Sequence, residues 1–302
     1  MSVPKPEERG EHRAEGEPGA HGGHGEPDPR GGHALGRHIR SLNERYLGPE
    51  GDALALEELA PVARRFAPEG SRVLEVGCGY GRNLVALGTL PLGLLVGCDV
   101  SRAELVKAQA RIAARPGGVT PRLVTHPADR LPFRDDAFDL VVLWQVLEHV
   151  IGADAKAALV AECVRVLKSG GHLLIETPNQ WFPVDYHDNR LPLVHWLLPF
   201  PAREWLTWRV RGERYHPSEY LSLPAAERLV GRSPGVRRVT RATRVYFATS
   251  YAEAWRTLGG TQLGMKRAIF ALLAPAHAAL SLFGQSADLL MPSLRVVWKV
   301  EK

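Results

Sequence analysis

Three glycines at alternate positions follow a short apolar run, where they could bring the backbone close to a ligand. They are Gly77, Gly79 and Gly81, directly after Arg72–Val76. The run predicts a buried strand, and Arg82 opens a segment with a helical pattern. Without a Cβ, a glycine backbone turns tightly and approaches a ligand closely. The free N–H groups at the start of the helix favour a carboxylate or phosphate at this loop.

An acid at the end of the next apolar run could add a second ligand contact. Asp99 follows Leu94–Cys98, and ligands of open α/β sheets bind outside the carboxyl ends of the strands. A carboxylate there can accept hydrogen bonds from both ribose hydroxyls, in NAD sites and in S-adenosylmethionine (SAM) sites alike. Asp99 therefore supports an adenosine cofactor without choosing between the two. Its alternative role is to cap the next helix, for which Ser101 is the better candidate.

The glycine spacing of the first loop distinguishes a nicotinamide site from a SAM site. A nicotinamide-binding loop is spaced G-x-G-x-x-G, whereas here Glu75 opens an E-x-G-x-G-x-G pattern. The segments Pro127–Val142, Trp144–Val150 and Val166–Asn179 follow in order. Together with the loop they resemble class I SAM-dependent methyltransferases of the type 11 group. The segment Leu-Glu-His-Val resembles that of the ubiquinone-pathway O-methyltransferases.

This resemblance implies SAM as the cofactor and assigns a role to several residues. The three glycines accommodate the methionine part, Glu75 supports the loop and the amino end of the cofactor, and Asp99 holds the ribose. Asp129 is the nearest acid for the adenine ring, because His126-Pro127-Ala128 stands where the family commonly has Gly-Asp-Ala. Trp144 lines the part of the site that holds the methionine portion of SAM, and core packing is its equally weighted alternative role.

A general base is harder to assign, and His149 is one candidate. In the family that it resembles, the pattern Glu-x-x-Glu-His is associated with a divalent metal. Here Gln145 replaces the first acid, and losing a charged ligand weakens a site for a hard cation. No metal is therefore expected. The alternative role for Glu148 and His149 is hydrogen bonding and packing at a helix start.

The elements that position these residues alternate between short apolar runs and longer amphipathic segments. Strands are expected at Arg72–Val76, Leu94–Cys98, Arg122–Thr125, Phe138–Trp144 and His172–Glu176, and helices at Arg82–Leu87, Arg102–Ala114 and Ala153–Leu167. The alternation indicates βαβ units, and the continuous apolar runs indicate strands covered on both faces. The expected fold is α/β: a Rossmann-like, doubly wound, mostly parallel seven-stranded sheet with an antiparallel last strand and helical insertions.

After Asn179 the resemblance becomes loose, and two insertions are expected to set substrate choice. Residues 181–208 hold four of the seven tryptophans. Three polar residues of the same stretch are candidates for substrate binding or base catalysis, or alternatively satisfied polar groups of a structural lid: His187, Asp188 and His195. The second insertion separates an expected sixth strand, Arg237–Phe247, from the last one, Leu294–Val300.

The second insertion contains an apolar segment, residues 268–287, without a fully charged side chain. Its length approaches that of a membrane span, but Pro275, His277 and Ser281 interrupt it. Packing on the domain or on a second subunit is therefore preferred to peripheral membrane contact, and both to a true span. With the tryptophan-rich insertion, this segment could accommodate a hydrophobic or lipid-like acceptor.

Composition divides the chain and narrows its function class. We expect a disordered tail at 1–34, an N-terminal helical segment at 35–70, a SAM-binding core at 71–180, a substrate or lid insertion at 181–235, and final strands with the apolar insertion at 236–302.

The net charge is +5, and the basic residues are spread over the chain, so a nucleic-acid partner is not favoured. Three cysteines without a CxxC pair suit a reducing cytoplasm, and the N-terminus offers no apolar stretch for a secretory signal. The expected location is cytoplasmic, with membrane association as the variant.

The expected function is transfer of a methyl group from SAM to a small-molecule acceptor, with oxygen as the preferred atom. Two alternatives stay open. One is a methyltransferase-like binding protein without turnover, and the other is an NAD(P)-dependent oxidoreductase, which the glycine spacing disfavours. Neither the acceptor nor the oligomeric state follows from the sequence.

Overall fold

A computed structural model describes residues 47–302 apart from short gaps at 116–117, 128–129, 186, 189–190, 212–217 and 259–262. The expected tail 1–34 and the adenine candidate Asp129 therefore lie outside the described residues. The division into 35–70, 71–180, 181–235 and 236–302 stays a prediction.

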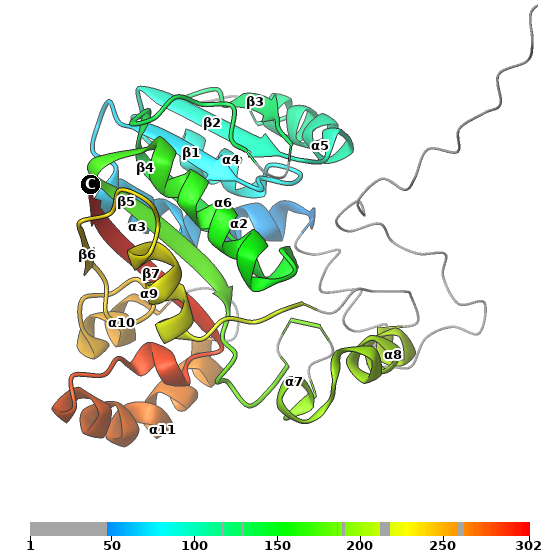
Figure 1. Ribbon diagram of the computed structural model, residues 1–302, viewed down its shortest axis with the longest axis vertical. Helices are drawn as coiled ribbons and strands as arrows, with labels where there is room; N and C mark the ends of the chain where they lie inside the picture. Colours follow the sequence, from blue (N-terminus) through cyan, green and yellow to red (C-terminus); the bar gives the residue numbers. More distant parts are fainter. Residues whose placement is uncertain are drawn as a thin grey trace, which may run out of the picture.

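A seven-stranded sheet forms the centre of the molecule (Figure 1). The strands are β1 Arg72–Val76, β2 Leu94–Asp99, β3 Arg122–Thr125, β4 Phe138–Trp144, β5 Leu167–Pro178, β6 Arg238–Arg241 and β7 Ser293–Glu301. Their order is β3-β2-β1-β4-β5-β7-β6. The pairs among β1 to β5 are parallel, and β7 runs antiparallel to both β5 and β6. The expected Rossmann-like sheet with an antiparallel last strand is confirmed.

Helices cover both faces of the sheet, and two apolar clusters lie between the layers. Figure 1 shows α6 crossing the near face. The helices are α2 Pro49–Glu58, α3 Ala60–Phe66, α4 Arg82–Gly88, α5 Arg102–Ala113, α6 Ala153–Val166, α7 Val194–Leu197, α8 Phe200–Arg211, α9 Leu223–Gly231, α10 Tyr251–Thr257 and α11 Leu263–Leu282, with short 3-10 helices η1 Leu147–His149 and η2 Ala287–Leu290. One cluster buries α6 and α9 against the sheet, and the other buries α3, α4 and α5. Helices α2 and α3 meet at Leu59, and Pro61 lies in the first turn of α3.

The sixth strand is much shorter than the expected Arg237–Phe247. After Arg241 the chain turns back, and Tyr246 and Phe247 adopt φ angles of +46° and +66°, which are incompatible with a strand. The turn is held by Asp288, whose Oδ1 accepts a hydrogen bond from the Tyr246 N–H at 2.9 Å. The expectation was wrong because the apolar composition continues past the point where tertiary contacts bend the backbone.

A buried cation connects the N-terminal helices to the sheet. Arg295 of β7 lies 2.9 Å from Glu58 of α2 and 3.7 Å from Glu176 of β5. Although burial alone would raise the pKa of Glu58, the Arg295 and Lys266 cations hold it below its ordinary value. Burial raises the pKa of Glu176. Arg295 thereby fixes α2 beside the carboxyl end of β5.

Candidate cofactor and acceptor site

The glycine loop wraps around the end of β2. The N–H groups of Gly77 and Cys78 both donate to the Cys98 carbonyl, at 2.8 and 3.0 Å. All three glycines take left-handed φ angles, +69° at Gly77, +47° at Gly79 and +79° at Gly81. Such angles are costly for residues with a side chain. The loop therefore has the tight conformation that its glycine content predicts.

The three glycines differ in what a side chain would meet. A Cβ at Gly77 would lie 2.6 Å from Val146, and one at Gly81 would lie 2.9 Å from Ala108 of α5. A Cβ at Gly79 would meet nothing within 4 Å. Gly77 and Gly81 thus serve close packing, whereas Gly79 borders open space in front of the loop.

Asp99 connects the end of β2 to this loop. Its Oδ2 accepts the Gly79 N–H and its Oδ1 accepts the Ser101 N–H, both at 2.8 Å. Ser101 is the helix cap, since its Oγ accepts the Glu104 N–H. Each carboxylate oxygen can accept more than one hydrogen bond, so Asp99 keeps acceptor capacity for a ligand hydroxyl.

Glu75 is a buried carboxyl group with one oxygen unused. Its side chain is 1% exposed, and Oε1 accepts from the Asn83 amide at 2.7 Å. Oε2 has no hydrogen-bond partner among the described residues. Burial raises the pKa of Glu75 to about 8, opposed by Asn83 and Arg82. An unpaired buried acceptor is costly, so Oε2 suits a donor supplied by a ligand. Asn83 was not among the site residues predicted from the sequence, although it lies at the start of α4, directly after the loop.

Trp144 lies at the carboxyl end of β4, beside this loop in the sheet register. Its ring packs 5.7 Å from that of Phe247, and the Arg295 guanidinium lies 5.7 Å from its centroid. Core packing, the alternative role, is therefore present. A contact between Trp144 and the cofactor stays a prediction.

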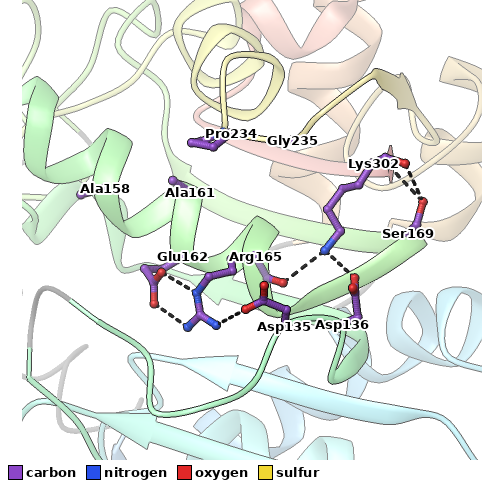
Figure 2. Close-up of a pocket in the computed structure, with 10 residues that line it drawn as sticks. All are labelled: Asp135, Asp136, Ala158, Ala161, Glu162, Arg165, Ser169, Pro234, Gly235 and Lys302. Carbon is purple, nitrogen blue, oxygen red and sulfur yellow. Dashed lines mark hydrogen bonds and ion pairs between the residues drawn. The ribbon is translucent and has the colours of Figure 1, made fainter.

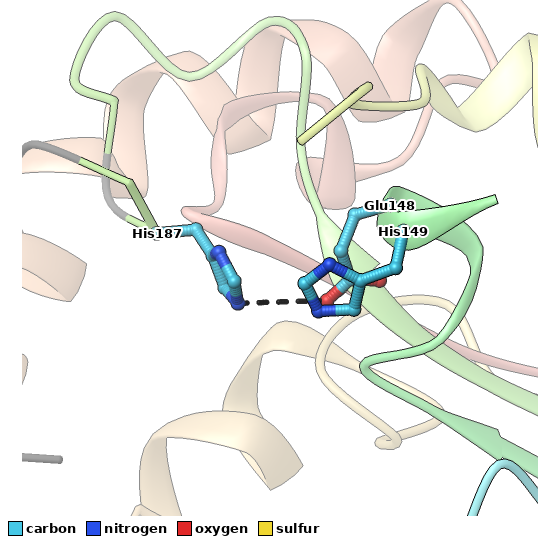
Figure 3. A group of neighbouring side chains, drawn as sticks. All are labelled: Glu148, His149 and His187. Carbon is cyan, nitrogen blue, oxygen red and sulfur yellow. Dashed lines mark ion pairs between the residues drawn. The ribbon is translucent and has the colours of Figure 1, made fainter. Parts of the chain in front are cut away.

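Beyond β4, three ionisable side chains converge (Figure 3). Glu148 is fully buried on η1, and its Oε2 accepts from Thr177 of β5 at 3.1 Å. His187 Nε2 lies 3.8 Å from Glu148 Oε1, and the His149 and His187 ring centroids are 5.3 Å apart. Burial raises the pKa of Glu148 to about 7, although His187 opposes it. The two candidate bases thus lie together, from segments far apart in the sequence.

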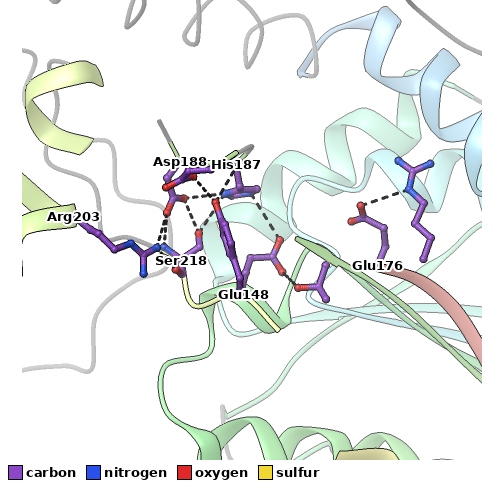
Figure 4. A network of polar contacts seen from close by, with 10 residues as sticks. Glu148, Glu176, His187, Asp188, Arg203 and Ser218 are labelled. Atoms are coloured by element: carbon purple, nitrogen blue, oxygen red, sulfur yellow. Dashed lines mark hydrogen bonds and ion pairs between the residues drawn. The ribbon is translucent and has the colours of Figure 1, made fainter. Parts of the chain in front are cut away.

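His187 is held in place by a buried polar network (Figure 4). Its Nδ1 lies 3.1 Å from Asp188 Oδ1. Asp188 also accepts from the Ser218 hydroxyl and the Ser218 N–H, both at 2.8 Å, and lies 3.6 Å from Arg203. Although burial would raise the pKa of Asp188, hydrogen bonds from His187 and Ser218 hold it below its ordinary value. The network leaves the opposite ring nitrogen, Nε2, on the side of Glu148.

His195 does not join this cluster. Its Nε2 lies 3.1 Å from the Gln180 carbonyl oxygen, and its ring packs 5.2 Å from Tyr220. Burial lowers the pKa of His195. Of the polar candidates in the first insertion, the structure therefore brings His187 and Asp188 to the site and gives His195 a packing position.

A shallow hollow elsewhere on the surface is lined by side chains that pair with one another (Figure 2). Arg165 pairs there with Glu162 at 2.6 Å and Asp135 at 2.7 Å, and Lys302 pairs with Asp136 at 2.5 Å. Asp136 precedes β4, so the hollow lies at the end of the sheet opposite the glycine loop. Its cations and carboxylates are matched by one another, and it includes none of the candidate site residues.

Part of the chain that contains the glycine loop is similar to known methyltransferases. A family model described as "Methyltransferase domain" matches residues 74–175. A ubiquinone biosynthesis O-methyltransferase from Alkalilimnicola ehrlichii is 33% identical over 45% of this chain and 56% of that protein. A probable S-adenosylmethionine-dependent methyltransferase from Mycolicibacterium smegmatis is 36% identical over 37% of this chain and 39% of that protein.

The relatives agree on the reaction type more than on the acceptor. A tRNA (carboxymethyluridine(34)-5-O)-methyltransferase from Arabidopsis thaliana is 33% identical over 36% of this chain and 24% of that protein. The alignments thus span between a quarter and just over half of the length of these three relatives. The matched region contains the glycine loop, Asp99 and Glu148, whereas His187 and Asp188 lie beyond it.

Proposed function

Because residues 74–175 form a SAM-dependent methyltransferase domain, we propose that this chain methylates a small, apolar acceptor at oxygen. The proposal rests on the position of the candidate cofactor and base residues, which all follow the carboxyl ends of neighbouring strands. The glycine loop, the unused Glu75 oxygen and Asp99 lie at the ends of β1 and β2, and a His–Glu cluster follows β4. A cofactor site beside a candidate base is the arrangement that methyl transfer to a hydroxyl requires.

The chain offers a contact for each part of SAM. Glu75 Oε2 is a buried acceptor with no hydrogen-bond partner in the described part of the chain, which fits the amino end, and the open side of Gly79 fits the methionine part. Asp99 would hold the ribose, Asp129 the adenine and Trp144 the methionine side. When bound, SAM supplies a methyl group already activated on a sulfonium. The protein then has to orient the acceptor and exclude water.

His187 would act as the general base. Asp188 keeps the proton on Nδ1, so that Nε2 can take the proton of an acceptor hydroxyl. His149, 5.3 Å away between ring centroids, would line the same space and is the second candidate. The tryptophans of the first insertion are 44–58% exposed, namely Trp181, Trp196, Trp205 and Trp208. They support an apolar acceptor, because exposed aromatic rings commonly cover apolar ligands.

The same cluster has the donor set of a divalent metal site, whereas the sequence predicted no metal. One donor atom from each of Glu148, His149 and His187 lies within 4.8 Å of the others, and Glu148 Oε1 has no hydrogen-bond partner among the described residues. Imidazole and carboxylate ligands suit ions such as Zn²⁺ or Mn²⁺. A bound ion would supply Lewis acidity toward an acceptor oxygen.

The test is transfer of label from methyl-labelled SAM to a panel of hydroxylated acceptors of increasing apolarity, with and without a chelator. We expect O-methylated product from apolar phenols or hydroxy lipids and little from hydrophilic ones. Transfer only to hydrophilic acceptors would contradict the apolar acceptor. Binding of SAM without transfer to any acceptor would favour the binding protein. Loss of transfer with the chelator, restored by one added metal, would assign the cluster to a metal.

The glycine loop gives a paired test of the cofactor site. Gly79→Ala places a methyl group in the open space assigned to the methionine part of SAM, so we expect SAM affinity at least about tenfold weaker. The positive φ angle costs the variant about 1–2 kcal/mol of stability, and we expect it to remain folded. Gly81→Ala is expected to lower the melting temperature, because its Cβ would lie 3.1 Å from the Ala108 Cα. Calorimetric titration and thermal unfolding measure the two effects. Wild-type SAM affinity in folded Gly79→Ala would show that the cofactor does not approach this loop.

We also propose a cytoplasmic location for the catalytic domain. Its three cysteines are free and buried, as suits a reducing compartment.

A further inference from the structure

We propose that α11 lies on an anionic lipid bilayer, with its outward face among the lipid headgroups and upper acyl chains. This inference goes beyond the proposed reaction and does not depend on it. Among the described residues, α11 is the one helix long and apolar enough to be a candidate membrane span. Phe270 is the single buried residue within it.

The polarity of α11 is reversed relative to a helix that faces water. Two of its three ionisable side chains lie on the inner side: Lys266 is 3.5 Å from Glu58, and His277 stacks on Tyr251 with ring centroids 4.3 Å apart. The outer side carries Leu272, 80% exposed, and Leu282, 86% exposed. Other exposed apolar residues of this surface are Met265, Ile269 and Phe283.

A helix on the surface of a globular protein ordinarily turns charged residues outward. Here no residue between Arg267 and Asp288 carries a full charge. Contiguous apolar surface of this kind marks a site of contact with a partner or a membrane. The outer face of α11 is therefore built for an apolar environment.

The contacts of α11 near both of its ends, through Lys266 to Glu58 of α2 and through the short connection to η2, argue for a helix that lies on the bilayer. At its C-terminal end only Phe283–Ser286 separate α11 from η2. The side chain of Asn179 in turn donates to the carbonyls of Asp288 and Met291 at 2.8 and 2.7 Å, which holds η2 on the sheet. Four residues reach less than about 20 Å, whereas a bilayer core is about 30 Å thick. A spanning orientation would require the domain to come apart, and an interfacial one would not.

The exposed charge around α11 favours anionic lipid. Arg267 on α11 and Arg256 on α10 are exposed. The nearby carboxylates already have cationic partners: Glu253 lies 3.0 Å from Arg65, and Glu58 lies 2.9 Å from Arg295. Cations next to an apolar helix attract anionic headgroups.

The distribution of tryptophan favours a bilayer over a second copy of the chain. Trp255 of α10 is 37% exposed, and it lines an apolar hollow between α10 and α11 with Phe270 and Ala274. The exposed tryptophans of the first insertion lie on α7 and α8 and in the segment before α7. Figure 1 shows α7, α8 and α11 at the lower end of the molecule in that view. Tryptophan concentrates at membrane interfaces, and a bilayer can contact both regions, whereas pairing of two α11 helices would cover one.

Flotation of the full chain with lipid vesicles tests the proposal. We expect the wild type to float with phosphatidylcholine vesicles that contain phosphatidylglycerol, and at least about tenfold less with phosphatidylcholine alone. The double variant Leu272→Glu/Leu282→Glu should lose most of the binding to anionic vesicles. Val106→Glu is the matched control, because Val106 is a 65% exposed apolar residue on α5, and it should float like the wild type.

Two outcomes would overturn the proposal. One is a wild type that stays in the aqueous fraction with anionic vesicles. The other is a double variant that floats like the wild type. A dimer in analytical ultracentrifugation that Leu272→Glu converts to a monomer, with no flotation, would assign the surface to a second copy instead. SAM affinity, measured in the same preparations, should be equal in all variants, so failure here is distinguishable from failure of the proposed function.

Discussion

Replacing His187 by alanine is expected to lower kcat by about 10²–10⁴-fold, the usual contribution of a general base, and to leave SAM affinity within about twofold. The physical reason is the placement of Nε2. This nitrogen lies beside Glu148 at the end of β4, while Asp188 occupies Nδ1 at 3.1 Å. Removing the ring removes the proton acceptor without touching the glycine loop or Asp99. Single-turnover transfer from labelled SAM measures the chemical step directly.

Two further variants separate base catalysis from packing. Asp188→Asn leaves the ring present but weakens the control of its tautomer, so kcat should fall less than in His187→Ala and the pH profile of kcat should move. His195→Ala is the matched control, since this histidine bonds to the Gln180 carbonyl outside the cluster, and kcat should change by less than about threefold. Full activity of His187→Ala, together with a large loss in His149→Ala, would transfer the role of base to His149.

Asp99→Ala is expected to raise the Kd for SAM by about 10²-fold or more, because hydrogen bonds to a charged group contribute about 1.5–3 kcal/mol each. Asp99 supports the site twice, since it would accept from the ribose and already accepts the Gly79 N–H at 2.8 Å. Asp99→Asn should be intermediate, since one acceptor oxygen remains. Calorimetric titration gives both Kd values.

A carboxylate at the other end of the sheet provides the control for Asp99. Asp139 accepts the Arg72 N–H at 2.9 Å and lies 2.6 Å from Lys168, so Asp139→Ala should change stability and leave SAM affinity unchanged. Equal SAM affinity in Asp99→Ala and the wild type would contradict the assigned ribose contact.

The strands around the cofactor site could be predicted, because residues next to each strand mark where it begins and ends. In β1, β3 and β4 an apolar run ends at a polar residue, a glycine or a proline, and the observed bounds equal the expected ones. The end of β6 was not predictable, because Val245 and Phe247 continue a strand-like composition while contacts with Asp288 and β7 impose positive φ angles nearby.

The candidate base was only partly visible in the sequence. His149 and His187 could each be proposed from their segments, but their meeting over Glu148 depends on a loop that folds back over β4. Periodicity also predicts a helix at α11 without saying which face meets the domain. The contacts of Phe270 and His277 decide that, and they exist only in the folded chain.

We infer that the loop after β1 and the acid after β2 bind SAM. Isothermal titration of the wild-type chain with SAM, and separately with NAD(P)H, tests it most directly. We expect a saturable one-to-one isotherm for SAM, weakened in Gly79→Ala and Asp99→Ala, and no saturable heat for either nicotinamide nucleotide. Saturable binding of NAD(P)H in the absence of any SAM binding would contradict it.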